Sequence, residues 1–440
     1  MENKLDKEVK VGICGLGTVG GATLKLLTGE NSDEIRRRAG ASISVSQVAT
    51  RTLNHSQVDG IPCVGTDPFA VVNDPSVEVV IETIGGYDPA YQLIKQALSN
   101  GKHVITANKA LIAERGNELF EVAQKSNVVL AFESSVAGGI PIIKGLREGL
   151  AANKINWLAG IINGTGNFIL TKMTSDNRQF NDVLEEAQTL GYAEADPTFD
   201  IEGIDAAHKL TIMSSIAFGI PLQFDKTYTE GISEITPEDI SYADELGYKI
   251  KHLGIANRTL SGIEMRVHPT LISKAQLLAN VNGVENAVMI NGNAVGSTLY
   301  SGPGAGGDAT ASAVVADLID IARHKIARSE SPIYPSLGYQ TMYEDAQILN
   351  IEDIKTEYYL RIPAMDRVGV MAKISSILQT HGISIEAVIQ KEPISEIVPI
   401  IILTHLARER NLNLAMNEIE SLEEVAGAIN RIRVESFEVR

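Results

Sequence analysis

The chain has 440 residues, a formal net charge of −17 and a sequence pI near 5.0. This length predicts more than one domain, and the acidic balance argues against nucleic acid and anionic membrane surfaces as partners, because both bind clustered Lys and Arg. With Cys14 and Cys63 as its two cysteines, the chain is not expected to have a disulfide framework or a Cys-rich metal site. A charged amino terminus and the lack of a long apolar run argue against a secretory signal and a membrane helix, so we expect a cytoplasmic protein.

Short apolar strands alternate with amphipathic helices over residues 1–136. The strand candidates are "VKVGICG", "SISVSQVAT", "VEVVIETIGG", "KHVITANK" and "NVVLAFESS". This alternation is typical of an α/β fold with a Rossmann-type doubly wound parallel sheet, so we expect a dinucleotide-binding domain here. We also expect a helix at about 307–345, after a glycine-rich turn, to pack back on this domain and complete it.

A glycine motif directly follows the first strand candidate and precedes a helical pattern. Its glycines are Gly15, Gly17 and Gly20, with Thr18 and Val19 between the last two. Glycines allow a tight turn and a close approach of the backbone to a ligand, and the amino terminus of a helix offers N–H groups to a pyrophosphate. The motif therefore predicts a dinucleotide site, with a glycine-rich turn that binds nothing as the alternative.

Cofactor preference depends on the end of the second strand candidate, "VATRT". Arg51 stands there near the position where NAD-preferring domains usually have Asp or Glu, although the spacing is longer than usual. A guanidinium suits a 2′-phosphate, so NADP(H) is favoured and NAD(H) is the alternative. A third interpretation stays open, in which the site holds NADP so tightly that NADP inhibits while NAD(H) is turned over.

The pattern changes between 137 and 306, where we expect an α+β domain for substrate binding, catalysis and dimerisation. Helices are predicted around "DVLEEAQTL", "IDAAHKLTIMSSIAFG" and "ADELGYKIKHLG", and strands at "EMRVHPTLI" and "NAVMINGNAV". From about Thr356 the order strand, helix, strand, strand, helix, strand predicts a third, βαββαβ domain over 355–440.

The segment "GYAEADPTFDIEGIDAAHKL", residues 191–210, places five carboxylates ahead of one lysine. Asp205 and Lys209 are four residues apart, so on a helix they share one face, and the carboxylate would keep the lysine charged and oriented. A charged and oriented lysine of this kind can act as a proton donor in catalysis. An idle surface pair is the alternative, but the apolar continuation "LTIMSSIAFG" predicts a buried helix. His208 points about 100° away from Lys209 and is expected to be structural.

Six motifs, in order along the chain, resemble those of the homoserine dehydrogenase family: "GLGTVG", "TANKA", "ESSVAGGIPII", "NGTGNFIL", the 191–210 segment and "GPGAGGDATASAVV". The resemblance covers residues 9–330, and the tail, with "RVGVMAKISSILQTHGISIEAVIQ", is similar to an ACT domain of the kind found in monofunctional bacterial members. It implies reversible, NAD(P)-dependent conversion of L-aspartate 4-semialdehyde to L-homoserine, in the biosynthesis of threonine, methionine and isoleucine.

The resemblance also implies roles for single residues. Glu194 and Asp205 match carboxylates that bind homoserine, Asp200 matches a position near the substrate, and Lys209 matches the catalytic proton donor. Lys109 in "TANKA" is a second cation at the carboxyl end of the sheet, which the family places near nicotinamide and substrate. The sequence leaves open which lysine transfers the proton. We favour Lys209 for proton transfer and Lys109 for positioning or polarising the carbonyl, with an idle surface lysine as the alternative for Lys109.

Two further groups follow from the resemblance. Gly191 and Gly306 match positions where the family's chain approaches the cofactor, although a glycine-rich hinge explains Gly306 equally well. A sodium-type monovalent cation is also implied, where the spacing alone predicts a tight strand-to-helix turn. Its implied ligands are Glu133 and the backbone oxygens of Val136, Gly138 and Ile140.

The tail is expected to regulate the enzyme. The resemblance implies feedback by an amino acid such as threonine, and we expect the effector at the turn around Asp366, Arg367 and Gly369. Modules of this kind pair through sheet edges, and the whole protein is expected to be a homodimer or homotetramer.

Two rival interpretations stay open. One is another Rossmann dehydrogenase that acts on an amino acid or a sugar, and the 191–210 segment counts against it. The other is a sensor that binds dinucleotide and amino acid without catalysis. The presence of Lys109 and Lys209 together with Glu194 and Asp205 argues against a sensor, since a sensor needs no proton donor.

Overall fold

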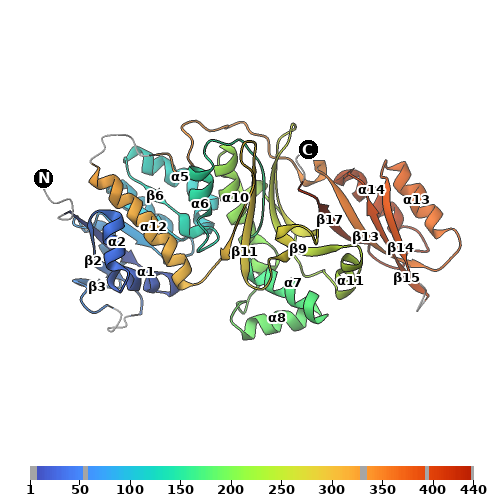
Figure 1. Cartoon of the computed structure of the whole chain (residues 1–440), viewed down its shortest axis with the longest axis horizontal. Helices are drawn as coiled ribbons and strands as arrows, with labels where there is room; N and C mark the ends of the chain where they lie inside the picture. Colours follow the sequence, from blue (N-terminus) through green and yellow to red (C-terminus); the bar gives the residue numbers. More distant parts are fainter. Residues whose placement is uncertain (1–6, 53–57, 328–333, 392–395, 438–440) are drawn as a thin grey trace. The chain divides into compact units, whose positions relative to one another are not determined.

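The computed structural model describes residues 7–52, 58–327, 334–391 and 396–437, and Figure 1 labels its elements. The chain folds into two compact units, each built from several stretches of sequence. Within the described residues, no helix is both long enough and apolar enough to cross a membrane. Unit 1 comprises Met1–Ile155, His208–Asp225 and Glu285–Ala346, and unit 2 comprises Asn156–Ala207, Lys226–Val284 and Gln347–Arg440.

Unit 1 contains a parallel sheet in the order β3-β2-β1-β4-β5-β6, which confirms the predicted doubly wound sheet. The strand order reverses between β1 and β4, and ligands of such sheets bind outside the carboxyl ends of the strands at this point. The short edge strand β3 was not among the predicted strands. The bounds are β1 (Glu8–Cys14), β2 (Ser42–Ala49), β3 (Cys63–Gly65), β4 (Val79–Glu82), β5 (His103–Thr106) and β6 (Leu130–Ala131).

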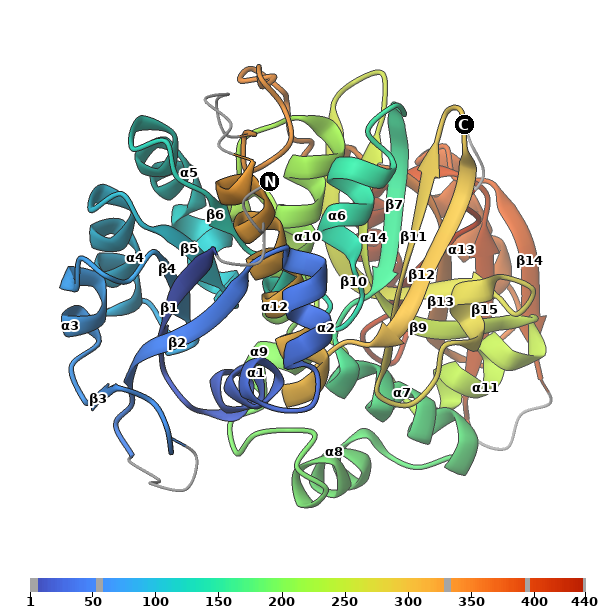
Figure 2. The same ribbon diagram turned by 60° about the vertical axis from the view of Figure 1, so that its left-hand side comes forward.

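Helices cover both faces of this sheet (Figure 2). One face carries α1 (Thr18–Thr28), α2 (Ser32–Ala39) and α12 (Gly307–Ile326), and the other α3 (Pro68–Asn73), α4 (Ala90–Ser99) and α5 (Lys109–Lys125). Helix α12 packs on α1 and α2, with Val314 and Leu318 in the same buried core as Val11 of β1. It therefore packs where we expected, but it ends at Ile326, so the helix predicted at about 307–345 is shorter.

Unit 2 is built on a sheet in which β7, β9, β10, β17, β13, β15 and β14 follow one another. The last strand in sequence, β17, lies between β10, to which it is parallel, and β13, to which it is antiparallel. The bounds are β7 (Ile155–Ile161), β9 (Tyr248–Arg258), β10 (Ile263–Ser273), β13 (Lys355–Met365), β14 (Ile385–Gln390), β15 (Ile397–Thr404) and β17 (Asn430–Glu435).

The C-terminal part of unit 2 has the predicted βαββαβ order, with α13 (Val370–Thr380) and α14 (Glu409–Glu420) packed on its strands. We call residues 355–437 the C-terminal module. Elsewhere the predicted helix over "ADELGYKIKHLG" is wrong: α11 (Pro237–Glu245) ends there, Gly247 has a φ of 85°, and β9 begins at Tyr248. The remaining helices of the unit are α7 (Gly164–Asp176), α8 (Phe180–Thr189) and α9 (Thr198–Ile201), while α10 (Ile204–Phe218) runs from unit 2 into unit 1.

Candidate active site

The glycine motif forms the turn between β1 and α1. Gly15 has a φ of 96°, in the region that favours glycine, and a Cβ on it would lie 2.8 Å from the carbonyl oxygen of Thr83. A Cβ on Gly20 would lie 1.9 Å from the carbonyl oxygen of Gly15, so α1 approaches the turn only because residue 20 is glycine. A Cβ on Gly17 would meet no atom within 4 Å. Packing thus explains the outer two glycines, whereas Gly17 leaves open space for a ligand.

The amino terminus of α1 fits a pyrophosphate. Gly17 is the N-cap, and no side chain caps the first N–H groups of the helix, which remain as donors for an anion. The turn lies beside the end of β2, because the N–H of Gly15 donates to the carbonyl oxygen of Ala49 at 2.8 Å. Arg51 follows two residues later and is exposed. The structure therefore places Arg51 at the same edge of the sheet as the glycine turn.

A second glycine-rich turn lies against the first. Gly306, with a φ of 112°, precedes α12, and a Cβ on Gly307 would lie 2.9 Å from the carbonyl oxygen of Thr18. The turn before α6 (Ile142–Lys144) packs on the same segment, since a Cβ on Gly138 would lie 2.6 Å from the carbonyl oxygen of Gly304. The residues predicted to contact cofactor and those predicted to bind a cation are thus neighbours in unit 1.

Glu133 lies at the start of this turn region and is 2% exposed. Its carboxylate accepts the N–H groups of Ile143 at 3.0 Å and Lys144 at 2.8 Å, and its own N–H donates to the Asp317 carboxylate at 2.9 Å. Burial, together with the charge of Asp317, raises the pKa of Glu133 to about 7. Over the described residues, no cluster of three or more His, Cys, Asp and Glu side chains could hold a metal ion.

Asn163 brings two of the predicted carboxylates together in unit 2. Its side-chain N–H₂ donates to Asp200 at 2.7 Å and to Asp205 at 2.9 Å. Its side-chain oxygen accepts the N–H of Gly166 at 2.8 Å, which caps α7 and fixes the amide. Two carboxylates held side by side in this way favour a bound cation such as an ammonium group.

Asp205 lies in the first turn of α10 and Lys209 one turn later, with exposed fractions of 6% and 9%. Neither is on a solvated face, so the interpretation as an idle surface pair does not fit. Glu194 lies apart from this group, exposed in the loop after α8. Gly191, with a φ of 76°, ends α8, which gives it a structural role whether or not it approaches a cofactor.

Lys109 is the first residue of α5, directly after β5, and is half-buried. Asn108 caps this helix by accepting the N–H of Leu111 at 3.2 Å, and its side-chain N–H₂ donates to the carbonyl oxygen of Gly86 at 2.6 Å. The cap therefore holds the start of α5 against the loop that follows β4. Lys109 lies at the carboxyl edge of the parallel sheet, after β5, which pairs with β4 on one side of the point where the strand order reverses.

Glu114 of α5 contacts the side chains of both Tyr87 and His208, which our sequence analysis did not expect to lie together. The Tyr87 hydroxyl donates to its carboxylate, and His208 Nε2 lies 3.2 Å from the same oxygen. His208 is fully buried, with its ring centroid 4.3 Å from that of Phe224. Burial and the neighbouring carboxylate raise the pKa of Tyr87 to about 12, so its hydroxyl stays protonated and donates.

These contacts support a structural role for His208, as predicted. They fix the turn of α10 that contains Lys209 to the helix that begins with Lys109. Sequence analysis did not identify Tyr87, Glu114 or Asn163 as site residues. The one available signal was that Asn163 begins the "NGTGNFIL" motif.

Three family models match the chain. The homoserine dehydrogenase NAD-binding domain matches residues 15–133, the homoserine dehydrogenase domain matches 141–319, and the ACT domain matches 358–424.

Relatives are similar over almost the whole chain. A homoserine dehydrogenase of Pseudomonas aeruginosa is 58% identical, with 98% of this chain and 100% of the relative covered. A crystal structure of a homoserine dehydrogenase from Thiobacillus denitrificans is 56% identical with a TM-score of 0.94, covering 98% of this chain and 99% of that one. A hyperthermophilic archaeal homoserine dehydrogenase in complex with NADPH is 28% identical with a TM-score of 0.60, covering 71% of this chain and 97% of that one.

Proposed function

The chain belongs to the homoserine dehydrogenase family, and from this premise we propose how its own residues bind and protonate the substrate. Members of the family interconvert L-aspartate 4-semialdehyde and L-homoserine with a nicotinamide cofactor. The observation that carries the proposal is that Asn163 holds Asp200 and Asp205 together, one helical turn ahead of Lys209.

The two carboxylates bind the α-ammonium group that aldehyde and alcohol share. Asp205 is buried and Asp200 half-buried, so a cation between them would be largely shielded from water, which strengthens the attraction. Glu194 lies earlier in the same segment, in an exposed loop, and would contact the substrate from there.

Lys209 transfers the proton. When the bound cofactor supplies a hydride to the aldehyde carbon, negative charge develops on the aldehyde oxygen, and a positioned ammonium group can donate a proton to it. Asp205 lies one turn earlier on the same helix, so its carboxylate shares a helix face with Lys209. Lys109, at the start of α5, polarises or positions the carbonyl. In the reverse direction Lys209 removes the proton from the homoserine hydroxyl.

NADP(H) is the favoured cofactor. The open space at Gly17 and the uncapped amino terminus of α1 fit the pyrophosphate, and the exposed Arg51 at the end of β2 fits a 2′-phosphate. The archaeal relative in complex with NADPH supports this preference. NAD(H) is the alternative, as is an enzyme that NADP inhibits.

A sodium-type cation would be held mainly by backbone oxygens. Each carboxylate oxygen of Glu133 already accepts an N–H group from α6 (Ile142–Lys144). The carbonyl oxygens of Val136, Gly138 and Ile140 would then provide most of the ligands, as hard cations prefer oxygen.

The ACT domain is proposed to bind an amino-acid effector such as threonine. The turn between β13 and α13 is exposed at Asp366 and Arg367, and Gly369, with a φ of 96°, is the N-cap of α13. Such exposed groups could contact the carboxylate and ammonium of an amino acid. Assembly into homodimers or homotetramers would bring further sheet edges together.

The experiment that tests the proposed substrate site compares Asp205→Asn with Asp196→Asn. Asp196 belongs to the same segment but is exposed and accepts its hydrogen bonds from Thr198. We expect Asp205→Asn to raise the KM for aspartate semialdehyde by about tenfold or more, since a charged hydrogen bond is lost, while the KM for NADPH stays unchanged. Equal effects of the two substitutions would contradict the proposal.

A further inference from the structure

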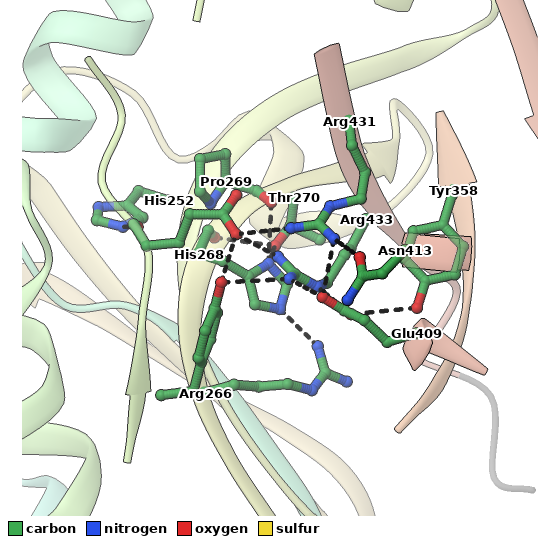
Figure 3. A network of polar contacts seen from close by, with 12 residues as sticks. His252, Arg266, His268, Pro269, Thr270, Tyr358, Glu409, Asn413, Arg431 and Arg433 are labelled. Atoms are coloured by element: carbon green, nitrogen blue, oxygen red, sulfur yellow. Dashed lines mark hydrogen bonds and ion pairs between the residues drawn. The ribbon is translucent and has the colours of Figure 1, made fainter. Parts of the chain in front are cut away.

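A buried polar network lies within unit 2, around Arg433 of β17 (Figure 3). Arg433 is fully buried, and its guanidinium forms two hydrogen bonds to Glu409 of α14, one of them at 2.8 Å. The same guanidinium lies 2.8 Å from Glu230. Tyr358 of β13 donates a further hydrogen bond to Glu409 at 3.2 Å. One buried arginine thus joins the core of the C-terminal module to a residue outside it.

The backbone register explains why Arg433 occupies this position. It pairs with Tyr358 of β13 on one side and with Thr270 of β10 on the other. The side chain therefore reaches both the C-terminal module and the sheet that continues beyond it. Buried charges are costly to separate, because the partner left behind remains desolvated, so this network fixes the distance between its members.

Glu230 extends the network toward the carboxylate pair. Its carboxylate accepts a hydrogen bond from Tyr228 at 2.8 Å and lies 3.5 Å from Arg431. Its backbone N–H donates to the carbonyl oxygen of Val267 in β10 at 2.8 Å, and its own carbonyl oxygen accepts a hydrogen bond from His252 Nε2 at 2.9 Å. Glu230 is therefore held at its side chain by the C-terminal module and at its backbone by β9 and β10.

His252 of β9 lies close to two glycines near Asp200 and Asp205, namely Gly166 and Gly203. Burial lowers its pKa to about 4, so the ring is neutral near pH 7 and Nε2–H can donate to Glu230. A Cβ on Gly203 would lie 3.1 Å from His252 Cε1, and a Cβ on Gly166 would lie 3.6 Å from His252 Nδ1. Gly166 lies in the first turn of α7, which Asn163 caps, and Gly203 lies in the turn between Asp200 and Asp205.

The residue after Glu230 contacts the same turn directly. A Cβ on Gly231 would lie 2.6 Å from the Glu202 carboxylate and 2.9 Å from the carbonyl oxygen of Ile201. The N–H of Ile232 donates to that carbonyl oxygen at 3.0 Å. We call residues 201–203 the carboxylate turn, because Asp200 and Asp205 flank it. The backbone of residues 231–232 packs on one part of this turn and His252 packs on another.

We propose that Glu230 and His252 are positioning residues that fix the carboxylate turn and couple its geometry to the Arg433–Glu409 pair of the C-terminal module. Neither needs to touch the substrate, since each acts through the backbone that carries Asp200 and Asp205. The inference rests on the proposed role of these two carboxylates in substrate binding.

The structure offers a matched control in a second buried group. Asp239 of α11 accepts hydrogen bonds from Arg361 and Tyr359 of the C-terminal module, at 2.7 and 3.1 Å, and from Asn430 at 2.7 Å. This group also joins the C-terminal module to the remainder of unit 2. It ends at the amino terminus of α11, where Asp239 and Thr236 form a capping box, and makes no hydrogen bond to the carboxylate turn in the described structure.

The kinetic test compares the parent with Glu230→Gln and Asp239→Asn, each of which removes one negative charge that is paired with an arginine, at nearly constant volume. We expect Glu230→Gln to raise the KM for aspartate semialdehyde about fivefold, the scale of indirect coupling through packed residues, with the KM for NADPH within about twofold of the parent. Asp239→Asn should leave both KM values within about twofold. A similar rise in both variants, or none in folded Glu230→Gln, would overturn the proposal.

Hydrogen–deuterium exchange of the segment 198–205 gives a readout that does not depend on catalysis. We expect faster exchange there in Glu230→Gln and unchanged exchange in Asp239→Asn. If the parent did not reduce aspartate semialdehyde, the proposed function would be wrong. The exchange rates of residues 198–205 would still show whether Glu230 positions the carboxylate turn. Should Glu230→Gln not fold, Tyr228→Phe removes a single hydrogen bond to Glu230, and unaltered exchange in that variant would equally overturn the inference.

Discussion

Arg51 is the residue on which cofactor preference depends in this account. It lies two residues beyond β2, at the edge where the Gly15 N–H meets the Ala49 carbonyl oxygen, and its side chain is exposed. A guanidinium at this edge can form paired hydrogen bonds with a 2′-phosphate, which NADH lacks.

Arg51→Ala is therefore expected to raise the KM for NADPH by about tenfold, the scale of a lost charged hydrogen bond, and to leave the KM for NADH almost unchanged. Initial rates at saturating aspartate semialdehyde measure both values. Arg38→Ala, which removes an exposed arginine paired with Glu34 on α2, is the control. Equal changes for the two cofactors would contradict a 2′-phosphate site.

Local spacing decided which site residues could be predicted. Asp205 and Lys209 lie one turn apart in one helix, so their relation could be predicted from the sequence. Asn163 contacts Asp205 across 42 residues and His208 contacts Glu114 across 94, and no local pattern encodes such pairs. The same limit explains why the Arg433 network, which joins residues more than 200 apart, was not anticipated.

The glycine turn shows that one motif combines two physical requirements. Gly15 and Gly20 are required by packing, since a Cβ on Gly20 would lie 1.9 Å from a carbonyl oxygen, whereas Gly17 faces open space. Pattern alone gives the three glycines equal weight. The structure separates Gly17, where a Cβ would meet no atom within 4 Å, from the two glycines that packing requires.

This difference predicts opposite outcomes for two alanine substitutions. Gly17→Ala should fold with an unchanged melting temperature but bind NADPH at least about tenfold more weakly, because the methyl group fills the space beside the pyrophosphate site. Gly20→Ala should instead lower thermal stability, by at least about 1 kcal/mol from overpacking. Thermal unfolding and NADPH fluorescence titration measure the two effects, and normal NADPH affinity in Gly17→Ala would contradict the assignment.

Turn signals account for the helix that was predicted wrongly. The "ADELGYKIKHLG" segment has helical periodicity, yet its Gly247 takes a left-handed conformation that ends α11, and the following residues pair as β9 with β10 over eleven positions. The strands β1, β4, β5 and β6 were predicted because they lie in apolar runs that are mostly buried, and β2 because polar and apolar residues alternate along much of it. No residue of β3 is buried, so this strand gives no such signal.

At the scale of the whole molecule, the order of predicted helices and strands indicated the C-terminal module. It did not indicate how the strands of this module pair with the strands of the preceding segment. Strand β17 pairs with β10 as well as with β13, so the C-terminal module shares a sheet with the remainder of unit 2. Pairing between strands more than 150 residues apart depends on tertiary packing, which the sequence pattern does not show. An effector bound to this module would therefore act on a continuous sheet.

Two buried histidines predict a pH dependence of stability. Burial lowers the pKa of His103 and His252 from 6.5 to about 4. Between these values the unfolded chain binds more protons than the folded chain, so the free energy of unfolding falls as the pH drops from 6.5 toward 4. Each histidine contributes a slope on the order of 1 kcal/mol per pH unit in this window.

His103→Gln should therefore lose less stability than the parent between pH 7 and pH 5, while His405→Gln, which alters an exposed histidine, should follow the parent. Urea unfolding at several pH values measures the slopes. A slope in His103→Gln as steep as that of the parent would show that His103 does not contribute.

The most direct test of the central claim is the initial rate of aspartate semialdehyde reduction with NADPH by the parent, Lys209→Met and Lys109→Met. The account predicts turnover by the parent and a fall in kcat of about 10²- to 10⁴-fold in Lys209→Met with NADPH binding retained, as expected when a general acid is removed. Lys109→Met should retain more activity than Lys209→Met. Turnover by Lys209→Met close to that of the parent would contradict the assignment of proton transfer to Lys209.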